Sequence, residues 1–106
     1  MSNELSIILP TLNEGKNLEK LIPQIFEILI NKNIVNNEIL VIDDGSTDGT
    51  EEMCQSLNNR YGNIRFIRRN NEPSLPQAIY EGIESAKFQN VAWMDADGSM
   101  PADTLG

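Results

Sequence analysis

Two acidic clusters are the residues of this sequence best suited to chemistry. Residues 43–46 are Asp-Asp-Gly-Ser, and residues 95–99 are Asp-Ala-Asp-Gly-Ser. Each cluster directly follows a short apolar run that is typical of a buried strand. Carboxylates within about 5 Å of one another repel by several kcal/mol at intermediate dielectric, so such a group persists only if some members are protonated or a cation lies among them. Their oxygen atoms suit a hard divalent ion.

The second cluster has a spacing that favours a metal site. Asp95 and Asp97 are two residues apart, so both carboxylates point to one side if the backbone is still extended there. Ser99 could add an oxygen directly or through water. Each cluster alone is also typical of a turn, because Asp and Gly are common turn residues. Their joint position at the ends of two predicted strands is what favours the functional interpretation.

The composition excludes several other kinds of chemistry. The chain has 106 residues, no His and one cysteine, Cys54. Without His there is no Ser-His-Asp triad and no His-bound zinc, and one cysteine cannot form an internal disulfide or a CxxC motif. Cys54 lies on the apolar face of a predicted helix, so we expect a buried hydrophobic side chain rather than a nucleophile.

Charge and hydropathy limit the partners and the location. The 16 acidic and 8 basic residues give a net charge of −8, which disfavours a nucleic acid or an anionic membrane surface as partner. No apolar run approaches the ~18 residues of a membrane span, and the N-terminus has no basic targeting segment. A cytoplasmic location is the expectation, with peripheral membrane association of a longer parent protein left open.

Short apolar runs alternate with helical patterns along the chain. The runs that predict strands are residues 5–9, 38–42, 64–68 and 91–94. The apolar spacings that predict helices cover residues 18–30, 50–59 and 77–87. Pro23 predicts a kink or a restart in the first helix, and Pro10 is expected to stop the first strand. The run at 64–68 alternates, which is typical of a half-exposed edge strand.

This alternation predicts a three-layer α/β/α domain with a mainly parallel sheet and right-handed crossovers. Ligands of such sheets bind beyond the carboxyl ends of the strands. Three of the four predicted strands end in polar segments. The carboxylates that would meet at this edge are those of Glu14, Asp43, Asp44, Asp95 and Asp97. A divalent cation among them would relieve their repulsion.

Three segments together resemble the family-two inverting glycosyltransferases of the GT-A fold, and within them the polyprenol-phosphate (dolichol-phosphate) mannosyltransferases. The segments are residues 8–14, 41–50 and 94–101. The resemblance implies the Rossmann-like N-terminal half of a GT-A nucleotide-diphospho-sugar transferase. It implies metal-assisted inverting transfer of a sugar from a GDP-mannose or UDP-glucose type of donor to an acceptor such as a polyprenyl phosphate or a glycan.

The resemblance also implies roles for residues after the first two strands. Pro10, Leu12 and Glu14 would line the base and the ribose of the donor. Ile42 and Asp44 would contact the nucleoside, with Asp44 accepting hydrogen bonds from the base or the ribose.

A further set of roles falls on the second acidic cluster. Asp95, Ala96 and Asp97 would form the D-x-D motif of the family and bind the donor. Asp97 would ligate Mg²⁺ or Mn²⁺ on the donor diphosphate, with Asp95 beside it, which makes these two aspartates the catalytic candidates. Ser99 matches a further polar position near the metal.

The chain departs from the family in length and in two details. The family's catalytic domain is longer, so residues 1–106 are expected to be one truncated nucleotide-sugar-binding domain without turnover of its own. The fourth strand would then be an open edge, through which we expect a homodimer. Leu12 stands where Tyr is common, and the loop 70–76 has two prolines where a Gly-rich, basic loop is common. Arg68 and Arg69 before it are expected to be a solvated strand end.

Other functions remain open at this point. A non-catalytic phospho-acceptor receiver-type signalling domain also carries acidic residues at strand ends, but it would need an acidic pair after its first strand and a later strand-end Lys. A sugar-nucleotidyltransferase would need a Gly-rich, basic loop after the first strand, where this chain has only Gly15 and Lys16. A non-catalytic nucleotide-binding or scaffold module is the third alternative.

Overall fold

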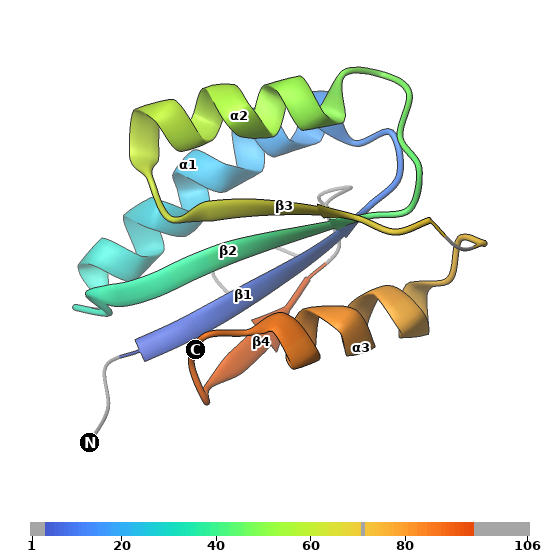
Figure 1. Ribbon diagram of the computed structural model, residues 1–106. Coiled ribbons are helices and arrows are strands. Elements are labelled where there is room, and N and C mark those ends of the chain that lie inside the picture. Colours follow the sequence, from blue (N-terminus) through green and yellow to red (C-terminus); the bar gives the residue numbers. More distant parts are fainter. Residues whose placement is uncertain (1–3, 71, 95–106) are drawn as a thin grey trace.

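The computed structural model describes residues 4–70 and 72–94, which form a three-layer α/β/α domain (Figure 1). The elements in chain order are β1 (Glu4–Thr11), α1 (Gly15–Asn31), β2 (Asn36–Asp43), α2 (Thr50–Tyr61), β3 (Ile64–Arg68), α3 (Leu75–Ser85) and β4 (Val91–Trp93). The strands lie in the order β3-β2-β1-β4, and all pairs are parallel. The predicted architecture and the edge position of β3 are therefore confirmed.

The middle residues of the two central strands, 7–9 in β1 and 39–42 in β2, are all apolar and buried because helices cover both faces of the sheet. Alternate residues of β1 and β2 pack with α1 and α2 in the larger core, as Ile7 and Val41 do. The residues between them pack with α3 in a smaller core, as Ile8 and Leu40 do. Figure 1 shows α1 and α2 on one side of the sheet and α3 on the other. Helix α3 comes so close that a Cβ on Gly82 would lie 2.6 Å from the Cγ2 atom of Ile8.

Helix α1 runs through Pro23 as one helix, so of the two expected outcomes, a kink or a restart, the restart does not occur. The apolar residues on both sides of Pro23 face the core in one stripe, and Leu18, Leu21, Ile25 and Leu29 are all buried. Packing of this stripe against the sheet outweighs the one hydrogen bond that a proline removes.

Pro10 lies inside β1, where the sequence predicts that the strand stops. The N–H group of Ser6 donates to the carbonyl of Asn90, on the β4 side of β1. Residues two apart in a strand face the same way, so the nitrogen of Pro10 also faces this side. Because this side faces β4 and not β2, the missing N–H of Pro10 costs the β1–β2 pairing nothing, and β1 continues beside β2 to Thr11.

The other boundaries differ from the expected ones by a few residues. Helix α3 begins at Leu75, because Ser74 caps it by accepting a hydrogen bond from the N–H of Gln77. Among the described residues, no helix has the length and apolar character needed to cross a membrane.

Candidate functional site

The loops that follow β1 and β2 are fastened to each other by hydrogen bonds. The N–H of Asn13 donates to Ser46 Oγ at 2.7 Å, and the N–H of Thr47 donates to Asn13 Oδ1 at 2.8 Å. The N–H of Gly15 donates to Asp48 Oδ2 at 3.2 Å. Asn13 adopts a left-handed conformation with φ of 58°, which Asn tolerates better than most residues. These contacts hold the carboxyl ends of β1 and β2 in one arrangement.

Asp43 is the internal anchor of the loop after β2. Its Oδ1 accepts hydrogen bonds from Thr11 Oγ1 at 2.8 Å and from Ser46 Oγ, and its Oδ2 accepts from the N–H groups of Gly45 at 2.9 Å and Ser46 at 2.7 Å. Burial alone would raise the pKa of Asp43, but the hydrogen bonds from Ser46, Thr11 and Gly45 outweigh it and lower the pKa. Asp43 is fully buried, so it does not join the other acidic side chains in a cleft.

Asp48 plays a similar part where α1 and α2 begin. Its Oδ1 accepts hydrogen bonds from the N–H of Thr50 at 3.1 Å and from the Thr50 hydroxyl, while its Oδ2 accepts from Gly15. The Thr50 hydroxyl is the main cause that lowers the pKa of Asp48. Asp48 therefore accepts from N–H groups at the starts of α1 and α2, where the N-cap residues Glu14 and Gly49 supply no side-chain hydrogen bond.

A pocket of about 280 Å³ opens at the carboxyl ends of β1 and β2. Its lining residues are Pro10, Thr11, Leu12, Glu14, Asp44, Pro73, Ser74 and Leu75. Leu12 and Leu75, each 45% exposed, offer apolar surface, and Asp44 and Glu14 offer acceptor oxygens. The pocket therefore suits a flat ligand with apolar faces and with N–H or O–H donors at its edge.

Both carboxylate oxygens of Asp44 accept hydrogen bonds at the wall of this pocket. Its Oδ1 accepts a hydrogen bond from Nη1 of Arg69, and its Oδ2 accepts one from the N–H of Ser74 at 3.2 Å. Its side chain is 8% exposed. A carboxylate oxygen has two lone pairs, so each oxygen of Asp44 keeps one acceptor position beyond these contacts.

The candidate site residues fall into three groups. Pro10, Leu12, Glu14 and Asp44 meet in the pocket. Ile42 does not line it, because its side chain is fully buried in the smaller core between β2 and α3. The candidates of the second acidic cluster, which are Asp95, Ala96, Asp97 and Ser99, lie outside the described residues.

The described part of the chain contains no group of three or more Asp, Glu, Cys or His side chains that could hold a metal ion. Strand β4 runs parallel to β1, with Trp93 beside Ile8, so its carboxyl end lies at the same edge of the sheet as the pocket. The described residues that line the pocket at this edge supply two carboxylates, those of Glu14 and Asp44.

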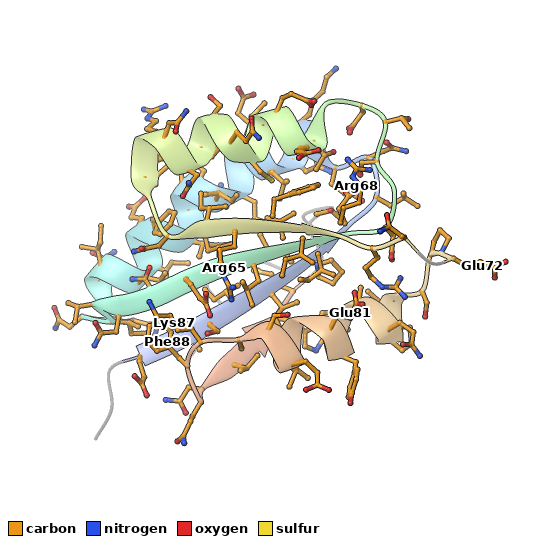
Figure 2. The ribbon with its side chains drawn as sticks, in the orientation of Figure 1. Arg65, Arg68, Glu72, Glu81, Lys87 and Phe88 are labelled. Atoms are coloured by element: carbon orange, nitrogen blue, oxygen red, sulfur yellow. The ribbon has the colours of Figure 1, made fainter. Side chains whose placement is uncertain are left out.

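The lining residues that were not candidates from the sequence are Thr11, Pro73, Ser74 and Leu75, and Arg69 reaches the pocket through its contact with Asp44. The expectation that Arg69 is solvated is wrong, because the residue is only 6% exposed. Two adjacent arginines at a strand end must face opposite sides of the sheet, and this alternation was the signal that one of them points inward. Arg68 lies on the other side, 3.5 Å from the carboxylate of Asp43 and 3.4 Å from that of Glu51 (Figure 2).

A larger cavity of about 470 Å³ lies at the opposite end of the sheet, where the strands begin. Figure 2 shows Arg65, Lys87 and Phe88 at this end. The buried carboxylate of Glu38 accepts hydrogen bonds there from Ser6 Oγ at 2.7 Å, from the N–H of Lys87 at 2.5 Å and from Nε of Arg65 at 3.2 Å. This cavity is the weaker candidate for a binding site, because the Glu38 carboxylate is already paired with Arg65 and the cavity lies away from the carboxyl ends of the strands.

Comparison with known proteins adds independent findings. The chain matches the family model described as Glycosyl transferase family 2 over residues 6–106. It is 34% identical to the dolichol-phosphate mannosyltransferase of Saccharomyces cerevisiae over 105 residues, which are 99% of this chain and 39% of that protein. It is 37% identical to the dolichol-phosphate mannosyltransferase of Pyrococcus furiosus over 102 residues, which are 96% of this chain and 28% of that protein.

A solved structure is similar as well. A mannosyltransferase from Pyrobaculum calidifontis, in complex with GDP-Man and Mn²⁺, superposes with a TM-score of 0.79 at 25% identity. The match covers 95% of this chain and 30% of that one. The described strands and helices thus have the arrangement of a GT-A glycosyltransferase, over a part of its length.

Proposed function

The chain belongs to glycosyl transferase family 2, and from this membership we propose that its pocket binds the nucleoside part of a nucleotide-sugar donor. The observation that carries the proposal is that Pro10, Leu12, Glu14 and Asp44 line one pocket at the carboxyl ends of β1 and β2. Membership in this family also argues against the receiver-type signalling alternative.

The size and lining of the pocket support a nucleoside. The volume of about 280 Å³ is just below the roughly 300–1,000 Å³ of typical small-molecule sites, which suits a base and a ribose better than a whole sugar nucleotide. Leu12, Pro73 and Leu75 offer apolar surface for the faces of a base. Leu12 replaces an aromatic side chain with an aliphatic one, so packing here relies on apolar contact rather than stacking.

We propose guanine as the base, and hence a GDP-mannose type of donor. The two remaining acceptor positions of Asp44 lie on two oxygens of one fixed carboxylate. Guanine carries two neighbouring N–H donors on one edge, whereas uracil carries one. The dolichol-phosphate mannosyltransferase relatives and the neighbour that binds GDP-Man support the same choice.

The donor diphosphate requires a counter-charge, because the charged side chains that line the pocket, Glu14 and Asp44, are both acidic. We propose that Asp95 and Asp97, which follow β4, hold Mg²⁺ or Mn²⁺ there, with Ser99 near it. Carboxylates are the donors these ions prefer, and the solved neighbour binds Mn²⁺. The ion would neutralise charge on the leaving diphosphate.

For the whole protein we propose hexosyl transfer to a polyprenyl phosphate, as the names of the relatives suggest. Such an acceptor is already anionic, so an inverting displacement at the anomeric carbon needs little help from a general base. The chain spans 39% and 28% of the lengths of these two relatives. We therefore expect the 106 residues by themselves to bind donor weakly and to show no turnover.

Calorimetric titration of the chain with GDP and UDP, each with and without Mn²⁺, tests this function. GDP should bind more tightly than UDP, and Mn²⁺ should strengthen both. Asp44→Asn should weaken GDP binding by about tenfold, because one acceptor becomes a donor. Glu27→Gln, an exposed carboxylate on α1, is the matched control and should change nothing. Equal affinity of the wild type and Asp44→Asn would remove the role proposed for Asp44.

A further inference from the structure

Arg69 is a buried cation at the end of β3, between the pocket and α3. Its side chain is 2% exposed. Nη1 donates hydrogen bonds to Oδ1 of Asp44 and, at 3.2 Å, to the carbonyl of Glu72. On its other side, Nε lies 3.0 Å from Oε2 of Glu81 on α3. Its backbone N–H donates to the carbonyl of Asp43 at 2.7 Å, which ties the residue to the end of β2.

The two carboxylates hold Arg69 in different ways. Asp44 accepts a directed hydrogen bond, whereas Nε of Arg69 and Oε2 of Glu81 are close without hydrogen-bond geometry. Both of these atoms are buried and have no hydrogen-bond partner among the described residues. Glu81 therefore supplies negative charge behind the guanidinium, while the directed bonds of Arg69 go to Asp44 and to the loop before α3. Figure 2 shows Glu81 on α3, at the end of the molecule where Arg68 and Glu72 also lie.

We propose that Arg69, backed by Glu81, is a positioning residue for nucleoside binding. This inference rests on the proposed function. Arg69 and the N–H of Ser74 take one acceptor position on each oxygen of Asp44 and so fix the plane of the carboxylate. The remaining acceptor positions of Asp44 then keep one orientation relative to the pocket. Binding therefore does not lose the conformational entropy of ordering this side chain.

Arginine suits this task better than lysine. A guanidinium is a planar group with donors at fixed angles, so it reaches Asp44 and the carbonyl of Glu72 while its other edge faces Glu81. A lysine ammonium is a point charge on a flexible stem, and it would keep the charge but lose the geometry. Arg69→Lys therefore separates the orientation of Asp44 from simple neutralisation of its charge.

The competing explanation is that the Arg69 contacts only stabilise the fold. A double-mutant cycle separates the two, because positioning through Asp44 makes the effect of Arg69 depend on Asp44. The affinity for GDP with Mn²⁺ is measured for the wild type, Asp44→Asn, Arg69→Lys and the double variant. We expect each single change to weaken binding about tenfold and the double variant to be within about twofold of Asp44→Asn.

Two further variants support the cycle. The side chain of Glu81 is 42% exposed, so Glu81→Gln should fold normally. It should weaken GDP binding about threefold to tenfold. If Arg69→Lys does not fold, Glu81→Gln provides the test. Arg65→Lys is the matched control, since Arg65 also pairs with a buried glutamate but lies at the opposite end of the sheet. It should leave GDP affinity unchanged.

The outcomes distinguish the inference from the function beneath it. If the wild type binds GDP and the losses from Asp44→Asn and Arg69→Lys multiply, the role of Arg69 is structural and the inference is overturned. It is equally overturned if both Arg69→Lys and Glu81→Gln bind GDP as tightly as the wild type. If the wild type binds no nucleotide with or without Mn²⁺, the proposed function itself fails and the inference falls with it.

Discussion

Asp43 and Asp44 are neighbours in the chain, yet each is paired with a different arginine on a different face of the sheet. Asp43 lies 3.5 Å from Nη1 of Arg68 and is enclosed by the loop on the α2 side. Asp44 is paired with Arg69 and lies at the pocket on the α3 side. The alternation of side chains along β2 and β3 produces this division, which separates a structural carboxylate from one available to a ligand.

Asp43→Asn should destabilise the fold rather than act on the pocket. An Asn side chain offers one acceptor oxygen where four donor groups from Thr11, Gly45 and Ser46 now converge. We expect a loss of roughly 2–4 kcal/mol in the free energy of unfolding, measured by urea denaturation. Glu51→Gln is the control, because its contact with Arg68 is exposed and should be worth less than about 0.5 kcal/mol. A loss below about 0.5 kcal/mol for Asp43→Asn would show that the hydrogen bonds to Asp43 do not stabilise the fold.

Stability should fall in acid through Asp43. Its pKa is lowered in the folded chain relative to the ordinary value of 3.8, so the folded state binds fewer protons than the unfolded state as pH falls. The stabilisation is present above about pH 4 and is lost as pH drops through the folded pKa. Urea unfolding at a series of pH values from about 6 down to 2 should show this loss, and Asp43→Asn should have a shallower pH dependence in the acid range. Parallel curves for the two proteins would refute the assignment.

Cys54 should be unreactive in the folded chain. It is 1% exposed, and burial, with the nearby charges of Asp43 and Glu51, raises its pKa to about 12. Since the thiolate is the reactive form, an aromatic disulfide reagent at about pH 8 should modify Cys54 only after denaturant is added. Rapid modification of the native chain would mean that α2 opens far more readily than its packing indicates.

We expect the chain to self-associate through β4 at high concentration. Within residues 4–94, β4 has β1 as its only neighbour, and Trp93 is 41% exposed. An unpaired apolar strand edge is a template for pairing with another copy. Sedimentation velocity should show a dimer fraction that rises with concentration and that Trp93→Lys reduces. A single monomeric species at all concentrations would count against this edge as an interface.

The order of strands and helices was predictable from the sequence because it depends on local patterns. The short, continuously apolar run 39–42 is typical of a buried strand between helices, and the spacing of Leu18, Leu21, Ile25 and Leu29 fits one face of a helix. In a parallel sheet the carboxyl ends of all strands lie at one edge, so the polar segments that follow them gather there. The meeting of Glu14 and Asp44 in one pocket was therefore also predictable in outline.

Tertiary structure decided what depends on contacts between distant segments. The different environments of Asp43 and Asp44 depend on donors that are distant in the sequence. Thr11, which donates to Asp43, is 32 residues away from it, and Arg69, which donates to Asp44, is 25 residues away. The burial of Arg69 depends on Glu81, on a different element. The continuation of β1 through Pro10 depends on β4, and not β2, lying on the side that the Pro10 nitrogen faces. Local sequence patterns carry propensity and periodicity, but the neutralisation of a buried charge and the completion of a pocket wall require partners that only the folded chain brings within bonding distance.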